Sequence, residues 1–168
     1  SEPIIVIEGA DCTGKTTLAN KFCDEISAQY FHCSYNPQWN IETYHRLLIH
    51  TAGKLETLAK VPAVVDRWCL SEAAYGSVYR DGPSYDTVSL AQEAIAAYNP
   101  TFILCTTENA ISTHNRMKEQ RREMYEDISP VITKFNDLVA TGQYGNYHVF
   151  DYDKVNANDF VDAIMQTY

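Results

Sequence analysis

Residues 9–16, GADCTGKT, carry two glycines at the spacing G-x-x-x-x-G-K-T. This stretch follows an apolar run, PIIVIE, at residues 3–8, and precedes a segment whose apolar residues recur at helical spacing. A strand, such a loop and a helix in this order form a phosphate-binding loop, because the backbone N–H groups and the helix N-terminus attract phosphate. The chain is therefore expected to fold around a nucleotide phosphate site.

The residue types of this loop have separate tasks. Lys15 is expected to reach the β- and γ-phosphates of ATP, and the Thr16 hydroxyl to bind Mg²⁺. A glycine-rich turn that only joins strand to helix is the alternative, and the strand–loop–helix order argues against it. The predicted ATP-binding residues are Asp11, Cys12, Thr13, Gly14, Lys15, Thr16 and Thr17.

Short apolar runs alternate with helical patterns along the rest of the chain. The runs lie at residues 29–35, 61–66, 101–105 and 147–151, and the helical patterns at 15–28, 41–60, 86–98, 129–140 and 159–165. This alternation predicts the α/β class: a doubly wound P-loop NTPase fold with a five-stranded parallel sheet flanked by helices. No repeat or linker interrupts the pattern, so we expect a single domain over residues 1–168, with a lid helix at about 109–124.

Composition limits the partners of this chain. Its 168 residues carry a formal net charge of -9, which argues against nucleic acid or an anionic lipid surface as the partner. No apolar stretch approaches the roughly 20 residues of a membrane span. The five cysteines form no C-x-x-C pair, which fits free thiols in a reducing cytoplasm, or a host cytoplasm if the source is viral. We expect small-molecule nucleotides as partners and leave a homodimer open.

An acid and an arginine follow the third apolar run. The stretch VVDRWCLSEAAYG, at residues 64–76, places Asp66 and Arg67 where that strand should end. Ligands of open α/β sheets bind beyond the carboxyl ends of the strands, so both residues should face the same crevice as the loop. Asp66 is expected to hold Mg²⁺, and Arg67 to donate to a second phosphate. A surface ion pair that ends the strand is the alternative.

Four cations gather in HNRMKEQRREMYE, at residues 114–126. On a helix Lys118, Arg121 and Arg122 share one side, with Arg116 elsewhere on the circumference. A lid that closes over a transferring phosphoryl group would use such charge in the transition state, whereas a solvated face screened by the interleaved glutamates is the alternative. The candidate catalytic residues are Lys15, Asp66, Arg67, Arg116, Arg121 and Arg122.

These motifs resemble those of thymidylate kinases and their relatives among the nucleoside monophosphate kinases. EGADCTGKTT is similar to the family's E-G-x-D-x-x-G-K-[ST]-T opening, and DRWCLSEAAY to its D-R-Y-x-x-S-x-x-A-Y stretch. RREMYEDISPVITKFNDL resembles the lid and the following helix more weakly. The resemblance implies an enzyme that transfers a phosphoryl group from ATP, with Mg²⁺, to dTMP or a related, modified pyrimidine deoxynucleoside monophosphate, giving the diphosphate.

The resemblance also implies roles in binding the acceptor. Asp11 would contact the sugar 3′-hydroxyl, Arg67 would hold the acceptor phosphate, and Tyr75 would crowd the 2′ position. Arg46 aligns loosely with an arginine that reaches the same phosphate. The predicted substrate-binding residues are Asp11, Trp39, Arg46, Arg67, Ser71 and Tyr75.

The sequence departs from the family pattern around the base. Glu72 stands where an asparagine or serine is common, Gly76 stands where a glutamine is common, and the R-E-P-G motif is absent. In its place Tyr35, Trp39 and Tyr44 offer an aromatic wall for a base, with ordinary core packing as the alternative. The identity of the base is therefore left open.

Three other activities remain as alternatives. A deoxynucleoside kinase needs a carboxylate to take the proton of a sugar hydroxyl, and the second apolar run ends in HCSYNP without an acid, which favours a monophosphate acceptor. Asp66 and Glu42 are the carboxylates that would reverse this preference. A kinase acting on bases or ends within DNA would need a local basic groove. A P-loop NTP hydrolase would need a residue that orients water, which the sequence does not identify.

Overall fold

The computed structural model describes residues 3–108 and 128–168. Their core is one sheet of five parallel strands in the order β2-β3-β1-β4-β5. The strands are β1 (Ile4–Gly9), β2 (Gln29–His32), β3 (Ala63–Asp66), β4 (Thr101–Thr106) and β5 (Tyr147–Asp151). The expected α/β fold with a five-stranded parallel sheet is confirmed.

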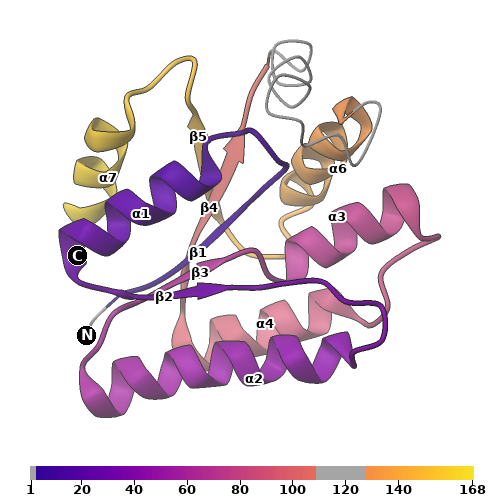
Figure 1. Ribbon diagram of the computed structural model, residues 1–168, viewed down its shortest axis with the longest axis horizontal. Helices are drawn as coiled ribbons and strands as arrows, with labels where there is room; N and C mark the ends of the chain where they lie inside the picture. Colours follow the sequence, from indigo (N-terminus) through magenta and orange to yellow (C-terminus); the bar gives the residue numbers. More distant parts are fainter. Residues whose placement is uncertain (1–2, 109–127) are drawn as a thin grey trace.

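Helices cover both faces of this sheet (Figure 1). On one face α1 packs against α7, and on the other α2, α3, α4 and α6 form the second layer. The helices are α1 (Lys15–Ile26), α2 (Ile41–Lys54), α3 (Cys69–Tyr79), α4 (Thr87–Tyr98), α6 (Ser129–Ala140) and α7 (Ala157–Met165), with a π-helical turn η1 (Leu55–Ala59) directly after α2.

The alternation of side chains along β1 explains why two layers are needed. Ile4 and Val6 belong to the hydrophobic cluster under α2, α3, α4 and α6. Ile5 and Ile7 belong to the cluster under α1 and α7. Because a strand sends successive side chains to opposite faces, a strand that is apolar throughout must be covered on both sides. The central position of β1, between β3 and β4, brings the ends of those strands to the loop that follows it.

The structure adds one helix that the apolar pattern did not indicate. Helix α3 begins at Cys69, and Cys69 to Ala74 are all buried. A helix buried all round its first turns shows no apolar stripe, so its periodicity carries no signal. The expected helix over 41–60 is divided between α2 and η1, and the expected terminal helix begins two residues earlier, at Ala157.

Two further expectations concern the lid helix and membrane-spanning segments. The expected lid helix, at about 109–124, lies outside the described residues. Within the described ranges, none of the helices combines the length and the apolar character that crossing a bilayer requires.

Candidate active site

The loop between β1 and α1 depends on backbone conformations that favour glycine. Gly9 has φ of 146°, and a Cβ there would lie 2.4 Å from the Cys105 carbonyl oxygen of β4. Gly14, at the N-terminus of α1, has φ of 79°. Within the loop the Thr13 hydroxyl donates to the Ala10 carbonyl across 2.6 Å. The loop is therefore held tightly between two positions at which a larger residue would be strained.

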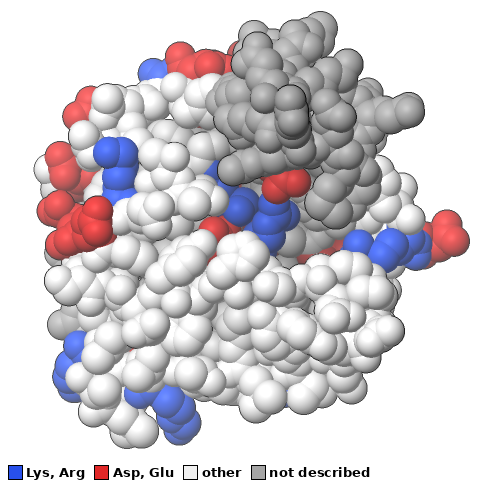
Figure 2. Space-filling model, in the orientation of Figure 1, with Lys and Arg blue, Asp and Glu red and all other residues white. Residues whose placement is uncertain are grey.

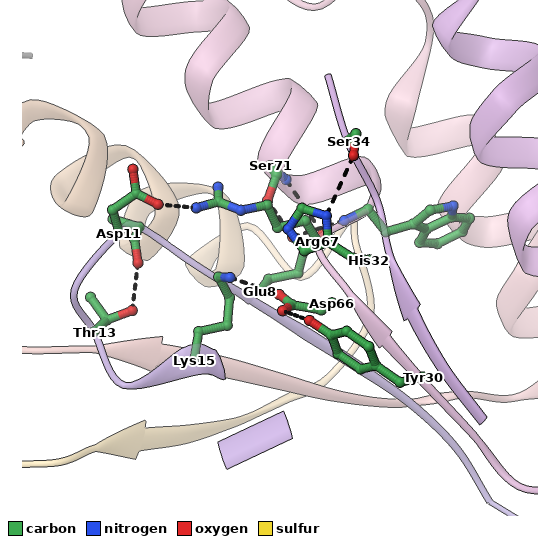
Figure 3. Close-up of polar contacts among 12 residues, drawn as sticks. Glu8, Asp11, Thr13, Lys15, Tyr30, His32, Ser34, Asp66, Arg67 and Ser71 are labelled. Carbon is green, nitrogen blue, oxygen red and sulfur yellow. Dashed lines mark hydrogen bonds and ion pairs between the residues drawn. The ribbon is translucent and has the colours of Figure 1, made fainter. Parts of the chain in front are cut away.

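Lys15, on the first turn of α1, points at the end of β3. Its Nζ lies 2.7 Å from Oδ1 of Asp66, and both side chains are buried. Tyr30 of β2 donates its hydroxyl to the other oxygen, Oδ2, so Asp66 is held from two elements (Figure 3). Burial, together with the bond to Asp66, raises the pKa of the Tyr30 hydroxyl, which keeps Tyr30 a donor.

Arg67 turns its side chain from the end of β3 toward the loop. Its φ is 72°, whereas its backbone N–H still donates to the Ile7 carbonyl of β1. The guanidinium forms an ion pair with Asp11 of the loop (Figure 3). It also lies 5.4 Å from the centre of the Tyr75 ring of α3. A strained backbone therefore places a mostly buried cation beside the phosphate-binding loop.

Glu8, the fully buried acid of β1, anchors the start of α3. It accepts hydrogen bonds from the backbone N–H groups of Trp68 (3.1 Å), Leu70 (2.8 Å) and Ser71 (3.4 Å), and from the Ser71 hydroxyl. Burial raises the pKa of the Glu8 carboxyl, and these donors oppose that shift. The N-cap position of α3 is Trp68, which supplies no side-chain cap, so a carboxylate from the neighbouring strand takes that task.

A pocket of about 380 Å³ opens beside Arg67. Among the described residues, its lining comes from the loop, the end of β2 with the residues after it, α2, and the start and end of α3. The lining residues are Asp11, His32, Cys33, Ser34, Tyr35, His45, Arg67, Trp68, Ser71, Glu72, Tyr75 and Arg80. In the view of Figure 2, basic and acidic side chains meet in the middle of this face, and the surface below them is mainly uncharged.

The pocket carries a second charged pair, between Glu72 in the first turn of α3 and Arg80 directly after its end. Arg80 donates to Oε1 of Glu72 across 2.5 Å, and only 2% of the Glu72 side chain is exposed. The Arg80 guanidinium lies 4.1 Å from the centre of the Tyr35 ring. An aromatic ring and a paired carboxylate thus line the same pocket as Arg67.

The predicted site residues divide into those that meet and those that do not. Lys15, Asp66, Asp11 and Arg67 come together at the carboxyl edge of the sheet. Asp11, Arg67, Ser71 and Tyr75 line the pocket. Cys12, Thr13 and Gly14 lie in the loop, and Thr16 and Thr17 are exposed on the first turn of α1.

Two predicted substrate-binding residues are not brought to this pocket. Arg46 of α2 pairs with Glu93 of α4 and lies 3.6 Å from Glu42, one turn away on its own helix. Trp39 is 48% exposed and makes a T-shaped contact with Tyr44, with ring centres 5.2 Å apart. Tyr35, from the same aromatic stretch, does line the pocket. The candidate catalytic residues Arg116, Arg121 and Arg122 lie outside the described residues.

The residues predicted to hold Mg²⁺ have the right chemistry. Mg²⁺ prefers oxygen ligands and is commonly bound by one or two carboxylates together with substrate phosphates. Asp66 supplies a carboxylate and Thr16 a hydroxyl beside the loop. No group of three or more histidine, cysteine or acidic side chains gathers as a metal site in the described ranges. The pair therefore fits a metal that shares its coordination with a bound nucleotide.

Sequence reasoning missed several residues of the site. Tyr30, Glu8, His32 and Arg80 reach it only because the strand order and α3 carry them there. One signal was present for Glu8: a carboxylate inside an otherwise apolar run must find donors when the strand is buried. Arg80 and Tyr30 carry no comparable signal in the sequence.

The geometry agrees with known folds. No protein-family model matches the chain, and neither does any curated protein. The YorR protein of Bacillus subtilis, solved in complex with phosphorylated GDP, superposes with a TM-score of 0.71 at 18% identity, over 98% of this chain and 94% of that one. The fold is shared.

Two further solved structures share this fold over nearly the whole chain. A deoxyadenosine kinase from M. mycoides, solved with the products dCMP and dCDP, gives a TM-score of 0.60 at 14% identity, over 97% of each chain. An unliganded sugar kinase from Janibacter sp. HTCC2649 gives 0.59 at 18% identity, over 99% of this chain and 94% of that one. The described residues thus have the α/β P-loop NTPase fold that the sequence predicted.

Proposed function

We propose that this protein transfers the γ-phosphoryl group of ATP, with Mg²⁺, to a deoxynucleoside monophosphate and releases the diphosphate. Lys15 and the loop N–H groups bind the donor phosphates, and Arg67 binds the acceptor phosphate. Asp66 and Thr16 hold Mg²⁺, which supplies positive charge to the phosphates when bound. Arg116, Arg121 and Arg122 remain the proposed cations of the transition state.

One observation carries this proposal: a mostly buried arginine stands between the phosphate-binding loop and a pocket. Arg67 pairs with Asp11 of the loop and also lines the pocket of about 380 Å³. A kinase must bring two phosphate groups together, and its catalysis is mainly positioning and electrostatic stabilisation. Arg67 supports an acceptor phosphate at one end of the pocket, since its planar fork suits phosphate oxygens.

The charged pairs support a monophosphate as the acceptor. The carboxylates Asp11, Asp66 and Glu72 are each already engaged by a cation in an ion pair. A monophosphate oxygen is already a nucleophile and needs no base. Among sugar contacts, Asp11 is proposed to bind the 3′-hydroxyl and Tyr75 to exclude a 2′-hydroxyl.

The base is the least constrained part of the acceptor. The resemblance to thymidylate kinases provides dTMP, or a related and modified pyrimidine, as the first candidates. Glu72 and Gly76 depart from that family's pattern, and Trp39 lies outside the pocket lining. The proposal is therefore a deoxynucleoside monophosphate kinase, with its base tested separately.

A deoxynucleoside acceptor is the second candidate, because His32 lines the same pocket at the carboxyl end of β2. An imidazole can take the proton of a sugar hydroxyl, which a nucleoside kinase requires. His32 lies within 3.4 Å of the Ser34 hydroxyl, which would hold its ring. This candidate would be favoured if His32→Gln lost its activity on nucleosides but kept its activity on monophosphates.

The test is ATP consumption with Mg²⁺ against deoxynucleoside monophosphates, their ribonucleotide counterparts, nucleosides and DNA oligomers. Diphosphate formed from one or two deoxynucleotides supports the proposal. Activity on nucleosides alone would replace it with the second candidate. Phosphorylated DNA whose formation falls steeply with salt would indicate a DNA kinase, and ADP without a phosphorylated acceptor would indicate a hydrolase.

A further inference from the structure

We propose that Glu72, held by Arg80, selects an acceptor whose base carries an exocyclic amino group, and rejects thymine and uracil. This inference rests on the proposed function and narrows its substrate. It concerns the pair that joins the first turn of α3, at Glu72, to the residue after its end, Arg80, and not the proposed phosphate contacts of Arg67.

The Glu72–Arg80 pair is more buried than an ion pair on the protein surface. Glu72 is 2% exposed at its side chain and Arg80 is 27% exposed, and both line the pocket. Taking two charges out of water is costly before their attraction is counted, so such a pair is weak evidence of stabilisation. Its place in the wall of a ligand pocket points to recognition.

Glu72 keeps acceptor capacity within the described structure. Its Oε2 accepts from both the backbone N–H and the hydroxyl of Ser84, each at 3.2 Å. Its Oε1 accepts from one Arg80 nitrogen, at 2.5 Å. A carboxylate has about four acceptor sites, so Oε1 can accept one more N–H group.

Arg80 supplies hydrogen-bond donors beside this acceptor and is held in place by two contacts. Its guanidinium lies over the Tyr35 ring, at 4.1 Å from the ring centre, and donates to Glu72. A guanidinium carries five N–H donors in one plane, so those not bound to Glu72 point outward in the plane of the guanidinium. The pair therefore offers one acceptor beside one or more donors, in fixed positions.

Amino-bearing bases match this arrangement. Cytosine and adenine present an amino donor beside a ring nitrogen acceptor, and guanine presents N–H donors beside acceptors. The amino group would donate to Oε1 of Glu72, and the neighbouring ring nitrogen or carbonyl would accept from Arg80. Glutamate accepting from the cytosine amino group is an established pairing in nucleic-acid recognition, as is arginine on guanine acceptors.

Thymine and uracil match it poorly. Their pairing edge has one N–H group between two carbonyl oxygens, so a carboxylate that accepts from that N–H faces a carbonyl as well. If the N–H donates to Oε1 and one carbonyl accepts from Arg80, the second carbonyl lies on the carboxylate side and repels it. If a carbonyl faces Oε1 instead, the buried carboxylate gains no donor. Sites that hydrogen-bond a substrate group reject analogues that lack it by large factors, because buried polar groups are left unpaired.

The experiment compares bases that differ only in this group. The wild-type kcat/KM is measured for dCMP against dUMP, and for dAMP against its analogue with hydrogen in place of the amino group, because the second member of each pair lacks the amino group. We expect the better amino-bearing member to exceed its partner by at least about 100-fold. In Glu72→Gln this ratio should fall at least about tenfold, because an amide can turn either its oxygen or its NH₂ group to the base.

The control is Glu93→Gln, which neutralises a carboxylate that is also paired with an arginine but lies outside the pocket lining. Its ratios should equal those of the wild type. A wild-type enzyme that prefers dTMP or dUMP overturns the inference, and so does an unchanged ratio in folded Glu72→Gln, which would mean that the pair only tethers the loop at Ser84. The wild-type ratios decide the matter even if the variant fails to fold.

The preference for an amino-bearing base can be tested even if the protein proves not to be a monophosphate kinase. If none of the monophosphates is phosphorylated, calorimetric binding of dCMP and dUMP to the wild-type protein still measures the preference. Tighter binding of dCMP that is lost in Glu72→Gln supports the inference without the reaction. Equal binding overturns it.

Discussion

Lys15 and Asp66 lie 51 positions apart in the sequence and form a buried ion pair of 2.7 Å at the carboxyl edge of the sheet. In this arrangement the lysine that should bind phosphate is neutralised by the acid that should hold Mg²⁺. A bound nucleotide would compete for both partners. The pair therefore joins the two halves of the proposed donor site.

Lys15→Ala is expected to lower kcat at least about 100-fold, because it removes a cation that faces developing charge on the phosphates. The protein should remain folded, since Asp66 keeps the hydrogen bond from Tyr30. ADP formation and a thermal melt measure the two effects. Lys21→Ala, on the same helix and bonded to Asn158 at 3.0 Å, is the matched control and should keep its rate. Wild-type turnover in Lys15→Ala would remove the loop from the mechanism.

Arg67→Ala is expected to raise the acceptor KM and to lower kcat, with at least about a tenfold loss of kcat/KM, because the acceptor phosphate loses its fork of donors. The KM for ATP should change much less. Steady-state kinetics with each substrate varied in turn measure the acceptor KM and the ATP KM separately. Lys54→Ala, at the exposed end of α2, serves as a charge control. An unchanged acceptor KM would return Arg67 to a structural role.

Tyr30→Phe is expected to lower the free energy of unfolding by about 1–3 kcal/mol, because the buried Asp66 carboxylate loses one of its two partners in the described structure. Urea unfolding measures this change. The control is Tyr98→Phe, whose hydroxyl meets the exposed His50, and it should cost under about 1 kcal/mol. Equal costs in the two variants would show that Tyr30 does not support Asp66.

His45 predicts a pH dependence of stability. Burial lowers the pKa of its imidazole from 6.5 to about 4, and its Nδ1 is bonded to the Tyr85 hydroxyl. Between these values the unfolded chain binds a proton that the folded protein does not. The free energy of unfolding should therefore fall as the pH drops from 6.5 to about 4, by on the order of 3 kcal/mol, and this contribution should be constant above pH 6.5.

The measurement compares urea unfolding of the wild type and of His45→Gln across that range. The variant lacks the titrating group but can still bond Tyr85. The difference between the two free energies of unfolding should be constant above pH 6.5. Below pH 6.5 the wild type should lose stability relative to His45→Gln. Two parallel curves would exclude His45 as the source.

Local features of the chain could be predicted because their signals are local. The loop at Gly9 to Thr16 is encoded by residues next to one another, and helix α6 has the bounds that its apolar spacing predicted. The inner strands β1, β3 and β4 were found because buried apolar runs bounded by polar residues leave little alternative. The sequence by itself thus determined the fold class, the phosphate-binding loop and the expectation that Asp66 and Arg67 face it.

Only the tertiary structure decided which distant side chains meet. Tyr30 reaches Asp66 because β2 pairs with β3, and Glu8 caps α3 from β1. Arg46, by contrast, turns to Glu93 on α4. Such contacts depend on strand order and on how helices pack, which periodicity does not specify, because the same alternation of strands and helices fits several orders. The contact of Glu72 with Arg80, and with it the proposed choice of base, belongs to this second kind.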